Sequence, residues 1–236
     1  MNNKYVFRKI LCGLTSLLFL LFFGCNKKNV EYSATEIYDK AVEYTVEIKA
    51  ESDGIGTSYG TGVIISNKGE IITNAHVVTY SKSNLTEAFT NFYIRFAYET
   101  KYRSVSLQKY DLELDLALLE IDDLNGLNLK NAKLGDSSKI NFGEKVYAIG
   151  NASNYGIGIF QGIVSVPLVN IDLEGTVRSV IQCDLTIASG NSGGALVNTR
   201  NQLIGITTFR VKDNSGKIVY GIVYCIPINN VKDFIK

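Results

Sequence analysis

A serine enclosed by glycines is the first group in this sequence whose surroundings suit covalent chemistry. It stands in the run Gly190-Asn191-Ser192-Gly193-Gly194. Glycine has no Cβ, so a ligand can approach the backbone closely at this point. If Ser192 is a nucleophile, the backbone N–H groups of Gly190 and Ser192 are placed to stabilise an oxyanion. Taken alone, the same pentapeptide is equally compatible with an ordinary Gly-Ser loop.

A serine hydroxyl is a weak nucleophile and needs an adjacent base, for which the sequence offers one histidine, His76. Two β-branched runs flank Asn67-Lys68-Gly69, a composition typical of a β-hairpin. The second run ends in Thr73-Asn74-Ala75-His76, so the hairpin would deliver the imidazole at the end of a buried strand. A single histidine in such a place is more often structural than functional, and the serine motif is what favours catalysis.

A carboxylate that orients the imidazole would complete a catalytic set. Three candidates, Asp111, Glu113 and Asp115, stand before an apolar run that starts at Leu116. Alternation along a strand would place all three on one face, so spacing alone leaves the choice open. The apolar run favours Asp115, because burial strengthens the interaction of an acid with a histidine.

The segment Gly60–Val78 resembles the histidine segment of trypsin-like serine proteases of the HtrA/DegP type. It contains the Gly-Thr-Gly start of the hairpin and the element Thr-Asn-Ala-His-Val-Val. The segment Gly190–Leu196 matches that family's Gly-Asn-Ser-Gly-Gly-Ala-Leu. The family's acid element, Asp-Leu-Ala-Leu, begins here only at Asp115. Two independent matches in the family's order are far more specific than either match alone.

The resemblance implies a role for each of these groups. His76 would be the general base and then the acid, and Asp115 would orient it. Ser192 would attack the scissile carbonyl, while the N–H groups of Gly190 and Ser192 would form the oxyanion hole. The resemblance therefore implies a serine endopeptidase, whose substrates by analogy with the family are unfolded or damaged exported proteins.

The implied fold is all-β, with two six-stranded antiparallel β-barrels of the trypsin-like type and a short C-terminal helix. The resemblance covers about residues 36–236, with the first barrel at about 44–125 and the second at about 132–228. The run Ala152-Ser153-Asn154 replaces the family's usual Pro-Phe-Gly, so the shape of this loop is expected to differ. We expect a protease domain without the PDZ domain that usually follows in this family.

The local patterns predict the individual elements. Helices are expected at 34–42 and from Pro227-Ile228-Asn229 onward, with Asn229 as N-cap. Residues Gly54 to Gly62 are interpreted as a glycine-rich turn. Strands are expected at 44–49, 92–96, 102–107, 145–150, 161–166, 180–184, 203–209 and 220–227.

Alignment with the family implies a specificity pocket whose walls are uncharged. The wall positions are Thr186, Ile187, Ile206 and Thr207. Preference for Arg or Lys would need a carboxylate in the pocket, because a buried cation without a partner is costly. The nearest acid, Asp184, is expected to point elsewhere. The pocket therefore favours small or medium aliphatic residues before the scissile bond.

The first 25 residues have the layout of an export signal. Lys4, Arg8 and Lys9 precede an apolar run, Ile10–Phe23, which ends at Gly24-Cys25. This ending resembles a bacterial lipobox, so residues 1–24 are expected to be a lipoprotein signal peptide and Cys25 the lipidated residue. Residues 25–35 would form a tether, and the domain would be exported and anchored at the membrane. An ordinary signal peptide or an uncleaved anchor is the alternative.

Charge and composition argue against other classes of partner. Without the three basic residues of the signal, 21 basic residues face 23 acidic ones, and no basic stripe suggests nucleic-acid binding. One histidine and no close cysteine pair leave no zinc ligand set, no carboxylate run reads as a calcium loop, and no cofactor is expected. Cys183 and Cys225 would lie on neighbouring strands, either as a disulfide or as two buried thiols.

There are two alternative functions. A catalytically idle protease-fold lipoprotein could act as a binding or chaperone module. An esterase of the α/β-hydrolase type fails because its order is serine, acid, histidine.

Asn191 cannot form the ion pair by which digestive relatives are activated, so activation by a cleaved amino-terminus is not expected. Family members often form homotrimers through their amino-terminal segment, for which Tyr32, Tyr38 and Tyr44 could serve.

Overall fold

The computed structural model describes residues 30–83, 85–173, 175–212, 215 and 217–236. The predicted signal peptide at 1–24, the predicted lipidation site Cys25 and the tether up to residue 29 lie outside the described residues. Within the described ranges, no helix has the length and the apolar character that crossing a membrane requires.

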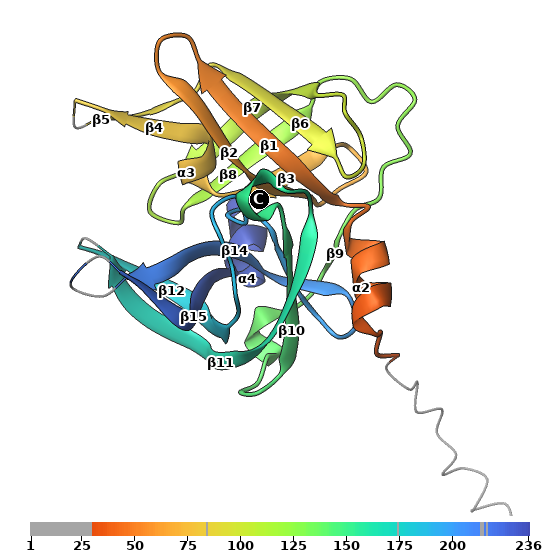
Figure 1. The fold of residues 1–236 in the computed structure, drawn as a ribbon, viewed down its shortest axis with the longest axis vertical. Helices are drawn as coiled ribbons and strands as arrows, with labels where there is room; N and C mark the ends of the chain where they lie inside the picture. The colour runs from red at the N-terminus through yellow and green to blue at the C-terminus, as the bar shows by residue number, and fades with distance from the viewer. Residues whose placement is uncertain (1–29, 84, 174, 213–214, 216) are drawn as a thin grey trace, which may run out of the picture. The chain divides into compact units, whose positions relative to one another are not determined.

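The amino-terminal half forms a closed antiparallel barrel (Figure 1). Its β-branched and leucine side chains alternate inward, and Ile48, Ile72, Ile94 and Leu119 have no exposed surface. The barrel closes in the order β1-β2-β3-β8-β7-β6. These strands are β1 (Thr45–Ser52), β2 (Gly56–Ile64), β3 (Glu70–Thr73), β6 (Asn91–Phe96), β7 (Arg103–Asp111) and β8 (Leu116–Ile121).

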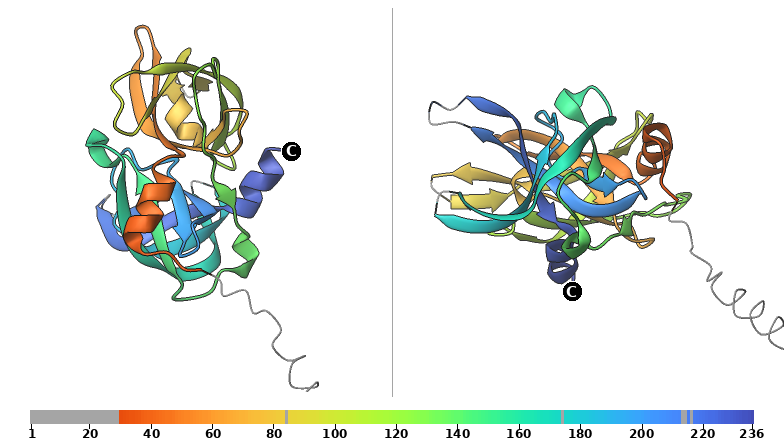
Figure 2. Two further views of the ribbon diagram at one scale, coloured as in Figure 1. Left: turned by 90° about the vertical axis from the view of Figure 1, so that its right-hand side faces the viewer. Right: turned by 90° about the horizontal axis from the view of Figure 1, so that it is seen from below.

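The carboxyl-terminal half forms a second barrel, shown from two further sides in Figure 2. Its strands follow the order β13-β10-β11-β12-β15-β14, and pairing of β13 with β14 closes the ring, while β9 (Lys133–Leu134) adds to β14 in parallel. The predicted fold of two six-stranded antiparallel barrels is therefore confirmed. The strands are β10 (Lys145–Gly150), β11 (Gly158–Leu173), β12 (Thr176–Asp184), β13 (Ala195–Asn198), β14 (Gln202–Lys212) and β15 (Ile218–Pro227).

A short helix lies near each end of the described chain. The first, α2 (Ala34–Ala41), starts with a capping box in which Ser33 and Glu36 satisfy each other's backbone N–H groups. The C-terminal helix α4 (Ile228–Phe234) is confirmed, but the prediction of Asn229 as its N-cap is wrong. The helix begins at Ile228 with Pro227 in the N-cap position, two residues earlier than predicted, and the N–H of Asn229 donates to the Ser137 hydroxyl at 3.2 Å.

The prediction of a glycine-rich turn at Gly54 to Gly62 is also wrong for most of that stretch. Residues from Gly56 onward belong to β2, which pairs with β1 from Gly56 to Val63. Glycine is used here for close packing, since a Cβ on Gly62 would lie 2.6 Å from a methyl carbon of Ile71. A glycine count alone cannot distinguish such a crowded strand from a turn.

Some secondary structure was not predicted from the sequence. The hairpin of β4 (Thr79–Lys82) and β5 (Leu85–Ala88) follows the histidine segment. Strands β11 and β12 extend well beyond their predicted lengths and pair as a long hairpin.

Cys183 and Cys225 are buried free thiols on the neighbouring strands β12 and β15. A hydrogen bond between the Cys225 thiol and Cys183, together with burial, raises the pKa of the Cys225 thiol, which keeps it protonated.

Candidate active site

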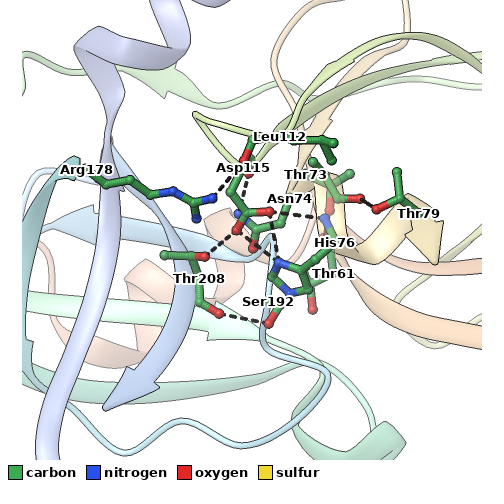
Figure 3. Close-up of polar contacts among 11 residues, drawn as sticks. Thr61, Thr73, Asn74, His76, Thr79, Leu112, Asp115, Arg178, Ser192 and Thr208 are labelled. Carbon is green, nitrogen blue, oxygen red and sulfur yellow. Dashed lines mark hydrogen bonds and ion pairs between the residues drawn. The ribbon is translucent and has the colours of Figure 1, made fainter. Parts of the chain in front are cut away.

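The three residues singled out for catalysis come from three separate connections of the fold (Figure 3). His76 lies on α3 (Ala75–Val78), the single helical turn that follows β3. Asp115 lies in the turn between β7 and β8, and both residues belong to the first barrel. Ser192 lies in the loop between β12 and β13 of the second barrel. The site is thus assembled where the two barrels meet.

His76 and Asp115 are paired directly. The imidazole Nδ1 lies 2.9 Å from Oδ2 and 3.0 Å from Oδ1 of Asp115. The backbone N–H of His76 also donates to Oδ1, at 3.1 Å, which fixes the carboxylate relative to α3. An ionised carboxylate only accepts hydrogen bonds, so Nδ1 of the neutral ring carries the proton. This tautomer leaves a lone pair on Nε2, where the ring can accept a proton.

The surroundings of Asp115 keep it ionised. Burial by itself would raise its pKa, because a low-dielectric environment disfavours the charged form. The hydrogen bond and charge of His76, together with the hydroxyl of Thr208, outweigh burial and hold the pKa below its usual range. Thr208 Oγ1 donates to Oδ2 at 2.6 Å. The side chain of Asp115 is 6% exposed and that of His76 49%, so a buried anion faces a half-exposed imidazole.

The acid lies in a turn, and the prediction of one strand through all three acidic residues is wrong. Strand β7 ends at Asp111, whose carboxylate accepts the N–H of Leu114 at 2.9 Å and stabilises the turn. Asp115 has a φ of +54°, a left-handed conformation that aspartate tolerates better than most residues. The reversal buries Asp115 and leaves Glu113 exposed. Only Asp115 of the three contacts His76.

The hydroxyl of Ser192 lies beside this pair but bonds elsewhere. It donates to the backbone carbonyl of Thr208 at 2.9 Å. The hydroxyl of Thr208 donates in turn to Asp115, so Thr208 connects the serine with the acid. Across the described ranges, no hydrogen bond joins Ser192 to His76. Such bonds are often long or poorly aligned in the absence of substrate, and a rotation of the serine side chain would redirect its proton.

The backbone around Ser192 has two unused donors. In the part of the chain that the structure describes, the N–H groups of Gly190 and Ser192 donate to no protein acceptor. Gly190 has a φ of +93°, and a Cβ there would lie 2.2 Å from the carbonyl oxygen of Asn151. Only glycine fits this close approach without strain. The loop conformation therefore leaves two N–H groups available to a ligand next to the serine hydroxyl.

Asn191, between these two residues, is buried and neutral. It is 1% exposed, and neither atom of its side-chain amide has a hydrogen-bond partner among the described residues. Its backbone carbonyl, in contrast, accepts from Thr207 Oγ1 at 2.6 Å and from the N–H of Gly194 at 2.9 Å. The loop is therefore held through its main chain, and a charged residue at position 191 would be buried without an ion-pair partner.

The residues predicted to line a specificity pocket fall into two groups. Thr186 is exposed, and Ile187 next to it is 6% exposed. Ile206 and Thr207 on β14 have at most 1% of their surface exposed, and the Thr207 hydroxyl is bonded to the Asn191 carbonyl. Asp184, the nearest acid, is exposed at the end of β12. All four wall positions are uncharged residues.

Three polar residues of the site were not predicted from the sequence. Thr208 bonds Asp115, and the side-chain amide of Asn74 donates to the Asp115 carbonyl at 3.0 Å. Thr61, on β2, donates from its hydroxyl to the Gly190 carbonyl at 2.6 Å. Asn74 stands within the histidine motif, and Thr208 follows a predicted wall residue, but neither position in the chain indicates which group its side chain contacts.

Among the described residues, no group of three or more histidine, cysteine, aspartate or glutamate side chains is arranged to hold a metal ion.

Comparison with known proteins identifies the same segments. Residues 60–206 match the family model of the trypsin-like peptidase domain. Among curated proteins, the chain is 38% identical over 185 residues to the serine protease Do-like HtrB of Bacillus subtilis (strain 168), covering 74% of this chain and 37% of that protein. It is 34% identical over 178 residues to the serine endoprotease DegS of Haemophilus influenzae, covering 75% and 49%.

A solved structure has the same fold. The HtrA-type protease AlgW, determined with a tripeptide, aligns with a TM-score of 0.72 and 29% identity, over 86% of this chain and 62% of that one. The chain spans 41% of the serine protease Do-like HtrA of Lactobacillus helveticus, to which it is 35% identical, and so matches less than half of such relatives. The family model, in contrast, covers more than half of the chain. This chain therefore belongs to the trypsin-like peptidase family, with HtrA-type serine proteases among its relatives.

Proposed function

We propose that this protein is a serine endopeptidase that works through His76, Asp115 and Ser192. The observation that carries the proposal is the pairing of His76 Nδ1 with a buried, ionised Asp115 beside the Ser192 hydroxyl. This pairing fixes the tautomer that a general base needs. The serine lies in a loop with two unused N–H donors, which is the arrangement that acyl transfer requires.

The proposed reaction follows from these contacts. Nε2 of His76 takes the proton from the Ser192 hydroxyl while the Ser192 Oγ attacks the scissile carbonyl of a polypeptide. The resulting oxyanion accepts hydrogen bonds from the N–H groups of Gly190 and Ser192, and Asp115 stabilises the imidazolium. The imidazolium then gives its proton to the leaving amine. Water, activated by the same histidine, releases the acyl group from Ser192.

A fluorophosphonate probe tests the proposal directly, because it reacts covalently with an activated serine. We expect the folded wild-type protein to be labelled and Ser192→Ala to remain unlabelled, with the label located on Ser192 by peptide mass spectrometry. The alternative, an idle protease-fold lipoprotein that only binds other proteins, predicts no labelling of the wild type. The intact histidine–aspartate pair favours the enzyme over this alternative.

The substrates that we propose are unfolded or damaged exported polypeptides. The relatives support export, since one from Buchnera aphidicola is named a probable periplasmic serine endoprotease, with 35% identity over 74% of this chain. The predicted signal peptide at 1–24 points to the same compartment.

The first prediction concerns specificity. We expect cleavage after Val, Ala or Ile, because Thr186, Ile187, Ile206 and Thr207 are uncharged and the nearest acid, Asp184, is exposed. The preference should be broad, since one methylene in such a pocket is worth about 1–3 kcal/mol. Digestion of a peptide library by the wild type, with Ser192→Ala as blank, measures it. Predominant cleavage after Arg or Lys would contradict it and would identify Asp184 as the pocket acid.

The second prediction concerns the membrane anchor. We propose that Cys25 is diacylated after removal of residues 1–24, and that Cys25→Ser releases the mature domain from the membrane fraction. A single acyl chain holds a protein only marginally, so stable anchoring requires more than one. Membrane fractionation of cells labelled with radioactive palmitate measures both the acylation of Cys25 and the membrane association of the protein. Ser33→Ala, close by in the chain, is a control that keeps the cysteine. Retention of Cys25→Ser in the membrane would indicate an uncleaved anchor.

The proposed homotrimer has less support from the tyrosines that suggested it. Tyr44 is buried, and its hydroxyl donates to the Asn201 side chain at 2.7 Å within the chain. The Tyr38 hydroxyl donates to the Ile157 carbonyl at 2.9 Å. Both side chains are therefore already used in packing the amino-terminal segment onto its own domain. Light scattering of the mature chain at several concentrations would distinguish a trimer from a monomer.

A further inference from the structure

Thr61 is a buried threonine of the first barrel that contacts the nucleophile loop of the second. Its side chain is bonded on both sides, since Oγ1 donates to the Gly190 carbonyl at 2.6 Å and accepts the Asn151 N–H at 2.9 Å. Its backbone N–H donates to the Ser192 carbonyl at 2.9 Å. Thr61 itself has no exposed surface, and Figure 3 shows it next to Ser192. One residue thus contacts both members of the proposed oxyanion hole.

The peptide on the amino side of Gly190 sets the direction of its N–H group. The carbonyl of this peptide belongs to Ser189 and accepts the Ser153 N–H at 2.6 Å. In a trans peptide the C=O and N–H point in opposite directions. Holding the Ser189 carbonyl toward Ser153 therefore turns the Gly190 N–H away from that segment. The position of Ser153 in turn depends on Asn151, whose N–H is bonded to Thr61.

The peptide on the carboxyl side of Gly190 is held by Thr61 directly. Glycine rotates freely about φ and ψ, so a peptide beside it keeps one direction only if both of its neighbours are anchored. The Thr61 hydroxyl fixes the Gly190 carbonyl and also the segment that fixes the Ser189 carbonyl. The peptide planes before and after Gly190 are therefore both linked to the Thr61 hydroxyl. Gly190 itself has a φ of +93°.

We infer that Thr61 is a positioning residue for catalysis, whose hydroxyl keeps the Gly190 N–H directed toward the oxyanion. This inference rests on the proposed function and adds to it a group that does not touch the substrate. Without the hydroxyl, the Gly190 carbonyl and the Asn151 N–H both lose a partner, so the peptides on either side of Gly190 lose their shared link to the first barrel. The loss would affect the transition state more than substrate binding, because the oxyanion forms only during the reaction.

The test compares Thr61→Val, Thr61→Ser and Thr45→Val with the wild type. Valine has nearly the shape of threonine but lacks the hydroxyl, and serine restores it. Thr45 is the matched control, because it is also fully buried in the first barrel and donates to a carbonyl, that of Ala41, at 2.8 Å. The measurements are kcat and KM on a peptide substrate, inhibition by a peptide boronic acid, and the melting temperature.

We expect Thr61→Val to lower kcat about 10- to 100-fold with little change in KM, which is below the loss from removing an oxyanion donor outright. Affinity for the boronic acid, whose tetrahedral adduct places an oxygen in the hole, should fall in parallel. Thr61→Ser should recover most of kcat. Thr45→Val should keep its kcat even if its melting temperature falls as far as that of Thr61→Val.

A kcat of Thr61→Val within about twofold of that of Thr45→Val would overturn the inference while leaving the proposed function intact. If Thr61→Val does not fold, Thr61→Ala provides the same comparison with a smaller side chain. Failure of both to fold, when Thr45→Val folds, would also overturn it and assign Thr61 to stability. A wild type that neither reacts with fluorophosphonate nor cleaves any peptide would instead overturn the proposed function itself.

Discussion

Ser192→Ala is expected to lower kcat for peptide cleavage by about 10⁵- to 10⁶-fold, because the members of a catalytic triad act as a unit. His76→Ala should cost a similar factor, since removing the base leaves the serine hydroxyl without a proton acceptor. The fold should survive, because the Ser192 hydroxyl makes one hydrogen bond, to the Thr208 carbonyl. One such bond contributes about 1 kcal/mol to the free energy of unfolding.

The measurement is single-turnover cleavage of a fluorogenic peptide, with circular dichroism to check folding. Ser81→Ala is the matched control, because it makes the same change at an exposed position on β4. Near-normal turnover by His76→Ala would exclude the proposed mechanism, since the sequence contains no other imidazole. Cleavage by repurified Ser192→Ala at a rate within about tenfold of the wild type would exclude Ser192 as the nucleophile.

Asp115→Asn is expected to lower kcat about 10⁴-fold, the loss found for this change in a trypsin-type triad. An asparagine can donate to Nδ1, which would move the ring proton to Nε2 and remove the lone pair that accepts the serine proton. It also removes the negative charge beside the imidazolium. Thr208 would then donate to an amide oxygen in place of a carboxylate, so the orientation of the ring would survive better than its basicity.

Glu113→Gln is the control for this change, because it neutralises an exposed acid two residues away in the same turn. We expect Glu113→Gln and Asp111→Asn to keep kcat within a few-fold of the wild type. Raising the pH should not rescue Asp115→Asn. A higher pH does not move the ring proton of His76 from Nε2 back to Nδ1, so the wrong tautomer persists. A comparable loss in Glu113→Gln would mean that the acid has been assigned to the wrong residue.

The sequence was most informative where several adjacent residues act together. His76 and Ser192 stand in contiguous motifs, and alternating β-branched residues indicated most barrel strands. Asp115 was chosen by resemblance and by the apolar run that follows it, whereas its left-handed φ and its burial are set by the turn into β8 and by contacts with a distant threonine. No local pattern specifies that reversal.

Polar side chains that act across the two barrels could not be predicted from the sequence. Thr207 and Thr208 are adjacent and chemically identical, yet one bonds the Asn191 carbonyl and the other Asp115. Successive strand residues face opposite sides, and the register of β14 against β15 also shifts just after Thr207. Thr61 was hidden in a stretch interpreted as a turn. Its partner Gly190 is 129 positions away, so only the folded structure connects them.

The division of the site between the barrels has a consequence for biogenesis. The base and the acid both lie before residue 122, whereas the nucleophile follows β12 in the second barrel. A chain that crosses the membrane amino-terminus first would therefore present a complete first barrel while its serine is still inside the translocation channel. In the proposed mechanism such an intermediate has no proteolytic activity. In an exported chain, the export machinery and neighbouring nascent chains would thus meet no complete active site until the last strands have emerged.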